Sequence, residues 1–394
     1  SLSLMNLKLR SKNDWGRLDM TSEWHEVPLR ELVGYISKGI APSYAEEASE
    51  TTIRVLNQKC NRNFRISYGD SRLHDTLKKK VPPERYVKPD DILINSTGAG
   101  TAGRIAQIED VPSATTIDGH MILIRSNGKV TQKFLGYALK AHQWEVLQLD
   151  EGSTGQTELN RDRLLDEILI NYPVSFDEQN AIVGTLESID RKLIVNEQLN
   201  DNLQQQAQAI YSSMFIDNPD PAWSHGHLSD LITVKYGKDH KKLADGIYPV
   251  YGSGGIMRYV ERPLYNKESV LIPRKGTLNN VMYVNQPFWS VDTMFYTEMK
   301  LPNVAKFVYH FVKAKDLASM NAGSAVPSMT TDILNAMEVV IPSASALEEF
   351  ESLVAPMYEA MEANDVQSKA LSQMRDTLLP KLMSGEIDVS AVQL

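Results

Sequence analysis

The sequence has very little cysteine and no long apolar run. Its 394 residues include a single cysteine, Cys60, so no disulfide can form within the chain and a cysteine-based zinc cluster is excluded. No run of about 18 apolar residues occurs, so a transmembrane helix is not expected. The N-terminal segment lacks the charged start and apolar stretch of a secretory signal. We therefore expect a cytoplasmic protein, and this length favours two or three domains.

Motifs that carry catalysis are also missing. The sequence has no Walker A motif, no G-x-S-x-G and no Asn/Asp-Pro-Pro-aromatic motif of amino-methyltransferases. Gly98, Gly100 and Gly103 form a literal G-x-G-x-x-G, but the early proline in the following RIAQIEDVPSA leaves no room for the crossover helix of a dinucleotide-binding unit. A close backbone turn and a loop approaching DNA phosphate are the alternatives. His225 and His227 have no clustered partners, so we expect no metal site.

Basic charge is scarce overall but unevenly distributed. The net charge is −9, which by itself argues against a nucleic-acid partner. Residues 21–150 hold 17 basic and 16 acidic side chains, and residues 217–322 hold 13 and 10. Residues 151–216 hold only 4 basic against 11 acidic side chains, and residues 323–394 hold 3 against 11. Because phosphate contact needs local rather than total positive charge, the two slightly basic blocks remain candidates for it.

The chain contains an internal duplication. Several short segments recur in the same order, with a spacing that falls from 199 to 168 residues along the chain. The matched pairs are WHEVPLREL (24–32) with WSHGHLSDL (223–231), DILINSTG (91–98) with SVLIPRKG (269–276), KFLGYALKA (133–141) with KFVYHFVKA (306–314), and EILINYP ending at Pro173 with MEVVIP ending at Pro342. Each copy is a strand-rich block followed by a long helical segment, and strands and helices do not alternate regularly. The pattern predicts an α+β fold.

The two helical segments carry a heptad seam. Apolar residues alternate at spacings of four and three, and both seams turn polar at an asparagine, as coiled coils do where register is fixed. The seam residues are Ile182, Leu186, Ile189, Leu193, Asn196 and Leu203 in the first copy and Phe350, Val354, Met357, Met361, Asn364 and Leu371 in the second. An ordinary amphipathic helix on a globular core is the alternative.

Connectivity then suggests a geometry. If the two helices pair antiparallel, the second returns the chain to the first block, which gives a cyclic arrangement with pseudo-two-fold symmetry. About 39 helical residues at roughly 1.5 Å each span about 58 Å. The paired helices would act as a strut that sets the distance between two similar blocks.

The sequence resembles the specificity (S) subunits of type I restriction-modification systems. The closing run LLPKLMSGEIDV (378–389), the run PVSFDEQNAIVGTLESIDRKL (173–193) after the GSTGQTEL junction, the W-x-x-x-x-L-x-[DE]-L opening of each block and YPVYGSGG (248–255) carry the resemblance. It extends from about Trp24 to Val389 in family order. The second junction departs from the first, with Pro327 in place of Gln156, and residues 6–20 match nothing.

The resemblance implies two target-recognition domains joined by two long antiparallel coiled-coil helices. The expected segments are an N-terminal arm (1–20), domain 1 (21–173), a central helix (174–216), domain 2 (217–342) and a C-terminal helix (343–394). It implies that each domain reads half of a bipartite double-stranded DNA site. Expected partners are two methyltransferase (M) subunits docked on the acidic helices and restriction (R) motor-nuclease subunits, with no membrane. S-adenosylmethionine, ATP and Mg are expected on those partners, and no catalysis in this chain.

Candidate DNA contacts are basic, amide and hydroxyl side chains in loops, because such groups read base edges and phosphates. In the first block they are Lys78, Lys79, Lys80, Ser96, Thr97, Arg104, Gln156 and Thr157. In the second they are Lys241, Lys242, Tyr251, Ser253, Arg258, Arg274, Lys275 and Thr277. Arg274 is the strongest of them, with a plain surface turn as the alternative.

Two other classes of function stay open at this point. A diverged methyltransferase or nucleotide-dependent enzyme would bind its cofactor and show turnover as a purified chain. A coiled-coil scaffold would join proteins without DNA, so salt-dependent binding to a bipartite duplex separates it from a DNA reader.

Overall fold

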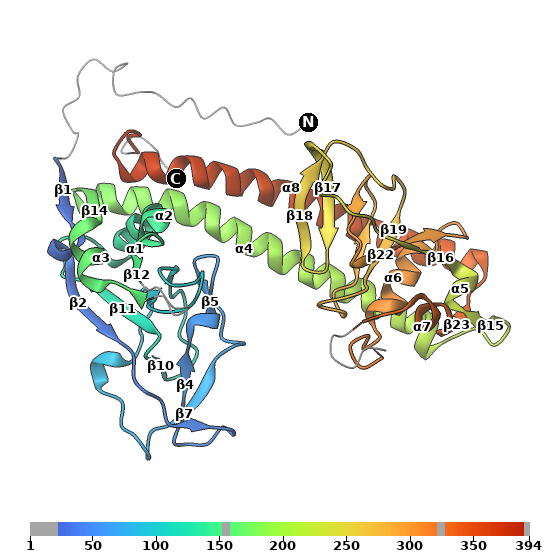
Figure 1. The fold of residues 1–394 in the computed structure, drawn as a ribbon, viewed down its shortest axis with the longest axis horizontal. Coiled ribbons are helices and arrows are strands. Elements are labelled where there is room, and N and C mark those ends of the chain that lie inside the picture. Colours follow the sequence, from blue (N-terminus) through green and yellow to red (C-terminus); the bar gives the residue numbers. More distant parts are fainter. Residues whose placement is uncertain (1–22, 152–157, 321–327, 390–394) are drawn as a thin grey trace. The chain divides into compact units, whose positions relative to one another are not determined.

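A computed structural model describes residues 23–151, 158–320 and 328–389 (Figure 1). The chain forms two compact units: unit 1 comprises Ser1–Ile194 and Ser368–Leu394, and unit 2 comprises Val195–Gln367. Two long helices, α4 (Phe176–Ser212) and α8 (Ala344–Met383), each contribute one part to each unit. The chain therefore leaves unit 1 along α4 and returns to it along α8, as the cyclic connectivity predicts.

Unit 1 is built from strands with few helices. Its strands are β1 (Trp24–Pro28), β2 (Val33–Lys38), β3 (Tyr44–Ala45), β4 (Thr52–Leu56), β5 (Asn61–Arg62), β6 (Arg65–Ile66), β7 (Arg72–Asp75), β8 (Ile92–Asn95), β9 (Ile105–Gln107), β10 (Thr115–Ile117), β11 (Met121–Ser126), β12 (Asp150–Glu151), β13 (Glu158–Leu159) and β14 (Leu169–Pro173). Its helices besides α4 and α8 are η2 (Leu29–Glu31), η3 (Gln58–Cys60), η4 (Pro83–Arg85), α1 (Gln132–Ala141), α2 (Gln143–Val146) and α3 (Arg161–Glu167).

Unit 2 follows the same plan with shorter loops. Its strands are β15 (Ser224–His227), β16 (Ile232–Tyr236), β17 (Asp245–Gly252), β18 (Gly255–Val260), β19 (Ser269–Pro273), β20 (Met282–Val284), β21 (Trp289–Ser290), β22 (Met294–Met299) and β23 (Glu338–Ile341). Its helices are η5 (Ser213–Asp217), which continues α4, α5 (Leu228–Leu231), α6 (Ala305–Lys313) and α7 (Thr331–Asn335).

The sheets confirm the duplication. Unit 1 has a four-stranded sheet in the order β2-β11-β8-β9, and unit 2 has one in the order β16-β22-β19-β20. The strand that opens each block pairs antiparallel with the strand that closes it, β1 with β14 and β15 with β23. The similarity reaches single residues. Gly39 N donates to Met121 O at 3.1 Å, and Gly237 N donates to Met294 O at 3.0 Å.

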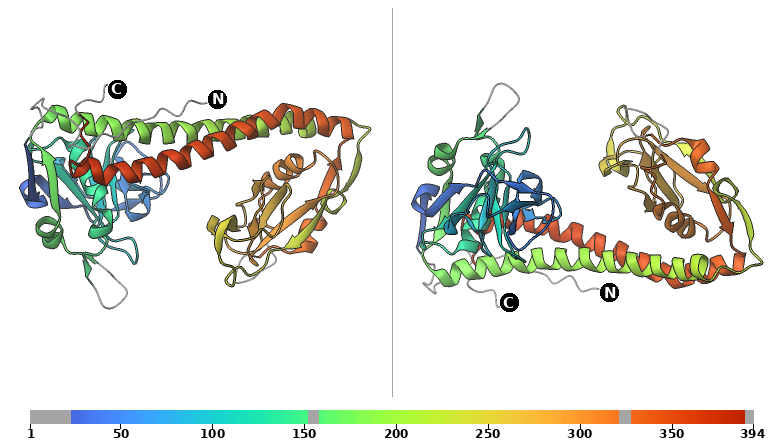
Figure 2. Two further views of the ribbon diagram at one scale, coloured as in Figure 1. Left: turned by 90° about the horizontal axis from the view of Figure 1, so that it is seen from above. Right: turned by 90° about the horizontal axis from the view of Figure 1, so that it is seen from below.

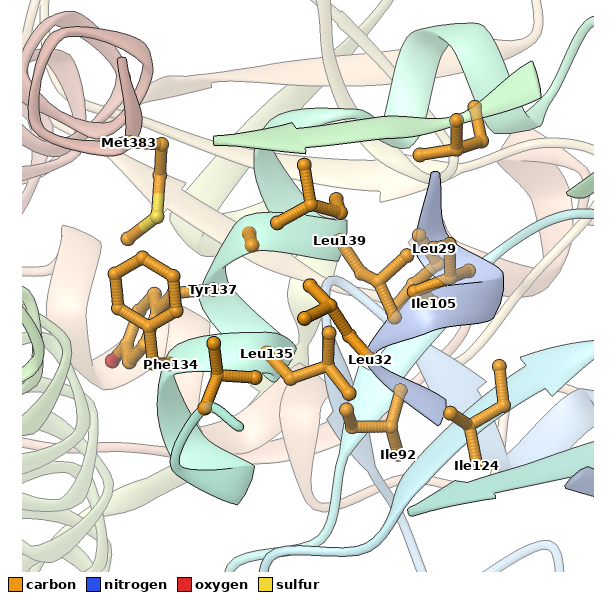
Figure 3. Packing of buried hydrophobic residues seen from close by; sticks show 14 of the residues in the cluster. Leu29, Leu32, Ile92, Ile105, Ile124, Phe134, Leu135, Tyr137, Leu139 and Met383 are labelled. Carbon is orange, nitrogen blue, oxygen red and sulfur yellow. The ribbon is translucent and has the colours of Figure 1, made fainter. Parts of the chain in front are cut away.

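The core of each unit lies between its main sheet and a helix. In unit 1, Phe134 and Leu135 of α1 pack with Leu32, which lies between η2 and β2, and with Ile92 of β8, and Met383 of α8 joins the same cluster (Figure 3). Thr131 caps α1 by accepting a hydrogen bond from Phe134 N, which fixes where the helix begins. The corresponding helix α6 is buried at eight consecutive positions, Ala305 to Val312, because its faces pack against both the sheet and the long helices.

The long helices run antiparallel, and their course within each unit can be followed in Figure 2. In unit 2, residues with higher numbers on α4 contact residues with lower numbers on α8, as antiparallel helices require. Asn196 Nδ2 donates to Gln367 Oε1 at 2.9 Å, and Asn200 Nδ2 donates to Met361 O at 3.3 Å. Asn364 Nδ2 in turn donates to Asn200 Oδ1 at 2.8 Å. The asparagines therefore pair across the two helices.

The predicted seam residues are all buried or half-buried. Toward the helix ends they also enter the cores of the units: Ile182 and Leu186 pack in the cluster that holds α1, and Phe350 and Val354 pack in the cluster that holds α6. The seam is thus a coiled-coil contact in its asparagine-rich stretch and an ordinary helix-on-core contact at its ends. The helix α4 lies inside the predicted segment 174–216. Helix α8 ends at Met383, before the predicted end at residue 394.

Candidate nucleic-acid interface

A glycine-containing loop occupies the same place in both main sheets. In unit 1 it joins the antiparallel strands β8 and β9, and in unit 2 it joins β19 and β20. Each loop is also held by the segment that precedes the unit's last short helix. Leu159 N donates to Ser96 O at 2.7 Å, and Met329 N donates to Arg274 O at 2.9 Å. The two loops are therefore fixed to their frames in the same way.

The unit 1 loop is a hairpin turn. Gly98, Gly100 and Gly103 have φ of +119°, +67° and +83°, values that an L side chain rarely adopts. At Gly103 a Cβ would also lie 2.9 Å from Val146 O. Because the loop returns directly to an antiparallel strand, it is not the strand-to-helix turn of a dinucleotide-binding unit.

Three sequence-predicted residues of unit 1 surround this loop. Ser96 is fully buried, so it supports the loop from behind and cannot contact an outside ligand in this conformation. The Thr97 hydroxyl is hydrogen-bonded to His120 Nδ1 at 2.7 Å. Arg104 Nη2 donates to Gly100 O at 3.3 Å, which places this guanidinium on the loop. Gln156 and Thr157 lie outside the described residues.

The lysine run of unit 1 belongs to a different sheet. Lys78, Lys79 and Lys80 follow β7 and are exposed. Lys78 Nζ lies 3.9 Å from Asp75 Oδ2, and Lys79 Nζ donates to Ala41 O at 2.8 Å. Among the described residues no hydrogen bond or ion pair joins the run to the glycine loop, so the two predicted contact regions are separate.

The unit 2 loop brings several predicted residues together. Arg274 Nη1 donates to Asp292 O at 3.4 Å, and its guanidinium carbon lies 5.3 Å from the centre of the Tyr236 ring. Lys275 and Thr277 are exposed. The β17–β18 turn lies against this loop, because Asn280 Nδ2 donates to Ser253 O at 2.8 Å.

The other predicted residues of unit 2 are placed less favourably for direct contact. Tyr251 is buried, its hydroxyl accepts from Gln286 Nε2 at 3.3 Å, and burial raises the pKa of that hydroxyl. Arg258 is committed within the unit, since its Nη2 donates to Leu243 O at 3.0 Å and to Asp245 Oδ1 at 2.7 Å. Lys241 and Lys242 are exposed in a turn before β17.

The structure adds residues that the sequence prediction missed. Four residues from η3 and the β5–β6 hairpin line a shallow surface cavity of about 480 Å³ together with Thr101 and Arg104. They are Gln58, Lys59, Arg62 and Asn63. The segment QKCNRNFR holds three basic and three amide side chains among eight residues, and this composition could have drawn attention to it.

A charged contact fixes the domain of unit 1 to its helices. Asp190 Oδ2 accepts from Tyr137 OH at 2.9 Å and from Lys140 Nζ at 3.0 Å, and Arg375 Nη1 donates to Asp190 Oδ1 at 3.1 Å. Burial alone would raise the pKa of Asp190, but these three partners outweigh burial and bring the pKa below its usual range.

Unit 2 makes the corresponding contact with neutral groups. His310 on α6 replaces Tyr137, and Tyr358 on α8 replaces Asp190. His310 Nδ1 lies 2.8 Å from Gln208 Oε1, and its Nε2 lies 2.9 Å from Tyr358 OH. Burial lowers the pKa of His310 to about 4, so the ring is neutral near pH 7.

Within the described residues, no group of three or more His, Cys, Asp or Glu side chains could hold a metal ion. None of the described helices is both long and apolar enough to cross a membrane.

Comparison with known proteins identifies the family. The model of the type I restriction modification DNA specificity domain matches residues 21–205 and 222–349. The chain belongs to this family of specificity subunits. The MjaIX specificity subunit of Methanocaldococcus jannaschii is 25% identical to this subunit over 438 residues, covering 98% of this chain and 99% of that one. The HindI specificity subunit of Haemophilus influenzae is 33% identical over 92 residues, 23% of this chain and 18% of that one.

A solved structure shares the fold. The specificity subunit of a type I restriction-modification system from M. genitalium matches with a TM-score of 0.58 at 18% identity, covering 93% of this chain and 98% of that chain. The two glycine loops of this specificity subunit therefore lie in domains whose family role is DNA recognition.

Proposed function

We propose that this specificity subunit reads a bipartite DNA site, with one half-site contacted by each unit. The observation that carries the proposal is the recurrence of an exposed, polar glycine loop at the same position of two duplicated sheets, β8–β9 and β19–β20. Two copies of one reading element in one chain suit a site with two halves. The loops offer Arg104, Arg274 and Lys275 as cations for base edges or phosphates.

The long helices set the spacing between the half-sites in this proposal. Helix α4 has 37 residues, which at roughly 1.5 Å per residue is about 56 Å of continuous helix. Adding or removing whole turns in both helices would change the number of base pairs between the two half-sites that are recognised.

The helices also dock two methyltransferase subunits in this proposal. They expose acidic side chains such as Asp201, Glu349 and Glu359. Repulsion between these negative charges and the DNA phosphates keeps the helices away from DNA. Replacing these three by their amides should weaken methyltransferase binding and leave the DNA affinity of the chain unchanged. S-adenosylmethionine, ATP and Mg²⁺ then act on the methyltransferase and motor-nuclease partners, and this chain performs no catalysis.

The test is to map methylated adenines made by the complex of this chain with its methyltransferase partner. Wild type should give one bipartite motif. Arg274→Ala should relax one or more base positions in a single half of the motif, at a cost of about 1–3 kcal/mol if the guanidinium reads a guanine edge. Lys300→Ala, which removes an exposed cation of the same unit that donates to Ser229 O, is the control. A motif that is not bipartite would refute the proposal, and a uniform loss would make Arg274 a phosphate contact.

A further inference from the structure

The shallow cavity of unit 1 combines cations and amides around one rigid turn. Arg62 exposes 66% of its side chain, and Asn63 and Lys59 are also exposed. The hydroxyl of Thr101 is buried at the cavity wall and has no hydrogen-bond partner among the described residues. The exposed cations and amides at the rim are the groups that a polar ligand can reach.

The β5–β6 hairpin holds this surface in one conformation. Its two central residues, Asn63 and Phe64, have φ of +52° and +62°, the pattern of a tight primed turn. Asparagine tolerates this region, but phenylalanine rarely adopts it, and residues held in this way cluster at binding sites. Phe64 is kept there because its backbone bridges to Ala106 and the Lys140 ammonium lies 5.0 Å from its ring centre.

The base of the hairpin is tied to the glycine loop. Asn61 is buried, and its Nδ2 donates to Arg104 O at 2.8 Å and to Asn95 Oδ1 at 3.1 Å. The hairpin tip and the loop therefore form one preorganised surface. Arg62 Nη2 lies 3.9 Å from Asp70 Oδ2, and because both side chains are largely exposed this ion pair is weak enough to open for a ligand.

We propose that Arg62 and Asn63 read base edges in the half-site of unit 1, while Lys59 and Arg104 contact phosphate. The inference rests on the proposed function and assigns specificity to residues outside the glycine loop. Arginine can pair bidentately with guanine and asparagine with adenine in the major groove, and both side chains stand at the exposed tip of a fixed turn. Lysine at the rim supplies charge without sequence information.

The experiment uses the full chain expressed with its methyltransferase partner and maps methylated adenines across a genome. Arg62→Ala and Asn63→Gly are the test variants, and glycine is chosen because it keeps the positive φ of the turn. Each should reduce discrimination by about tenfold or more at one or two positions of one half-site, with the other half unchanged. The unchanged half is the internal control for folding.

Lys59→Ala is the matched variant from the same cavity. It should lower the extent of methylation at all sites equally and leave the motif intact. Recognition of neither half-site should become more sensitive to salt. If neither Arg62→Ala nor Asn63→Gly alters the motif, the inference is overturned. A bipartite wild-type motif in the same experiment would still support the proposed function. A wild-type motif with only one half would instead overturn the proposed function and, with it, this assignment.

Discussion

The contrast between the two domain-to-helix contacts leads to a prediction about acid stability. His310 is fully buried in unit 2, between Gln208 of α4 and Tyr358 of α8. An unfolded histidine has a pKa near 6.5, whereas the folded pKa is about 4. The unfolded chain therefore binds the proton first as the pH falls, and this contribution to stability is complete above about pH 6.5 and lost between 6.5 and 4.

The magnitude follows from the shift. A lowering of about 2.5 pKa units at about 1.36 kcal/mol each amounts to roughly 3 kcal/mol. In the corresponding contact of unit 1 the titrating group is Asp190 on α4, and its partners hold its folded pKa below the usual value of an aspartate. Its contribution is present above the ordinary pKa of an aspartate and falls away only as the pH drops through the lower, folded value. Unit 2 should thus weaken at a higher pH than unit 1.

Hydrogen exchange followed by mass spectrometry can resolve the two units. Between pH 7 and pH 4.5, after correction for intrinsic exchange rates, amides of α6 should lose about 2 kcal/mol of protection, since the full loss is reached only below pH 4, and amides of α1 much less. His310→Phe keeps ring packing against Tyr211 and Phe350 and removes the titration, so α6 should become pH-insensitive in this range. His225→Gln, at an exposed histidine of the same unit, is the control. Parallel losses in α6 and α1, or an unchanged slope in His310→Phe, would refute the reasoning.

Two further substitutions test the helix pair and the duplicated frame. Asn196→Leu should raise the stability of the helix pair by about 1 kcal/mol in urea unfolding. Asn196 is buried, whereas its side-chain partner Gln367 is exposed and can turn to water, and its second acceptor, Asn364 O, is a backbone group held at 3.4 Å. A loss of stability would contradict this. Gly39→Ala should destabilise unit 1 by about 3 kcal/mol, because its Cβ would lie 2.1 Å from Asp118 O. Gly69→Ala, whose Cβ would meet only Ser67 Oγ at 3.6 Å, should be near neutral, and equal melting temperatures for the two variants would count against the clash.

The sequence alone is sufficient to predict the α+β class, the duplication and the antiparallel helices. The long helices follow from apolar residues with a regular period, such as the seam from Ile182 to Leu203, the duplication follows from segments that recur in the same order, and the antiparallel pairing is what connectivity and the family resemblance imply. The register asparagine Asn196 was visible for the same reason, because it interrupts an apolar series.

The residues of the proposed DNA-reading surface are harder to predict. Ser96 and Tyr251 have the chemistry of contact residues, but the structure buries them, and burial of a single polar side chain leaves no periodic signal. Arg62 and Asn63 escaped notice because their importance comes from a two-residue turn whose second position, Phe64, is not a usual turn residue. Loop geometry of this kind depends on tertiary contacts, such as those of Asn61 with Arg104, that lie far apart in the sequence.

The anchoring of both glycine loops has a consequence for how this protein can vary. Residues that hold the loops, such as Ser96 and the strands beneath, are buried, whereas Lys275 and Thr277 at the tip face solvent. Exchanges at such exposed positions usually alter stability by less than about 0.5 kcal/mol. If the loop tips read DNA as proposed, substitutions there would change the recognised sequence with little effect on the stability of the fold.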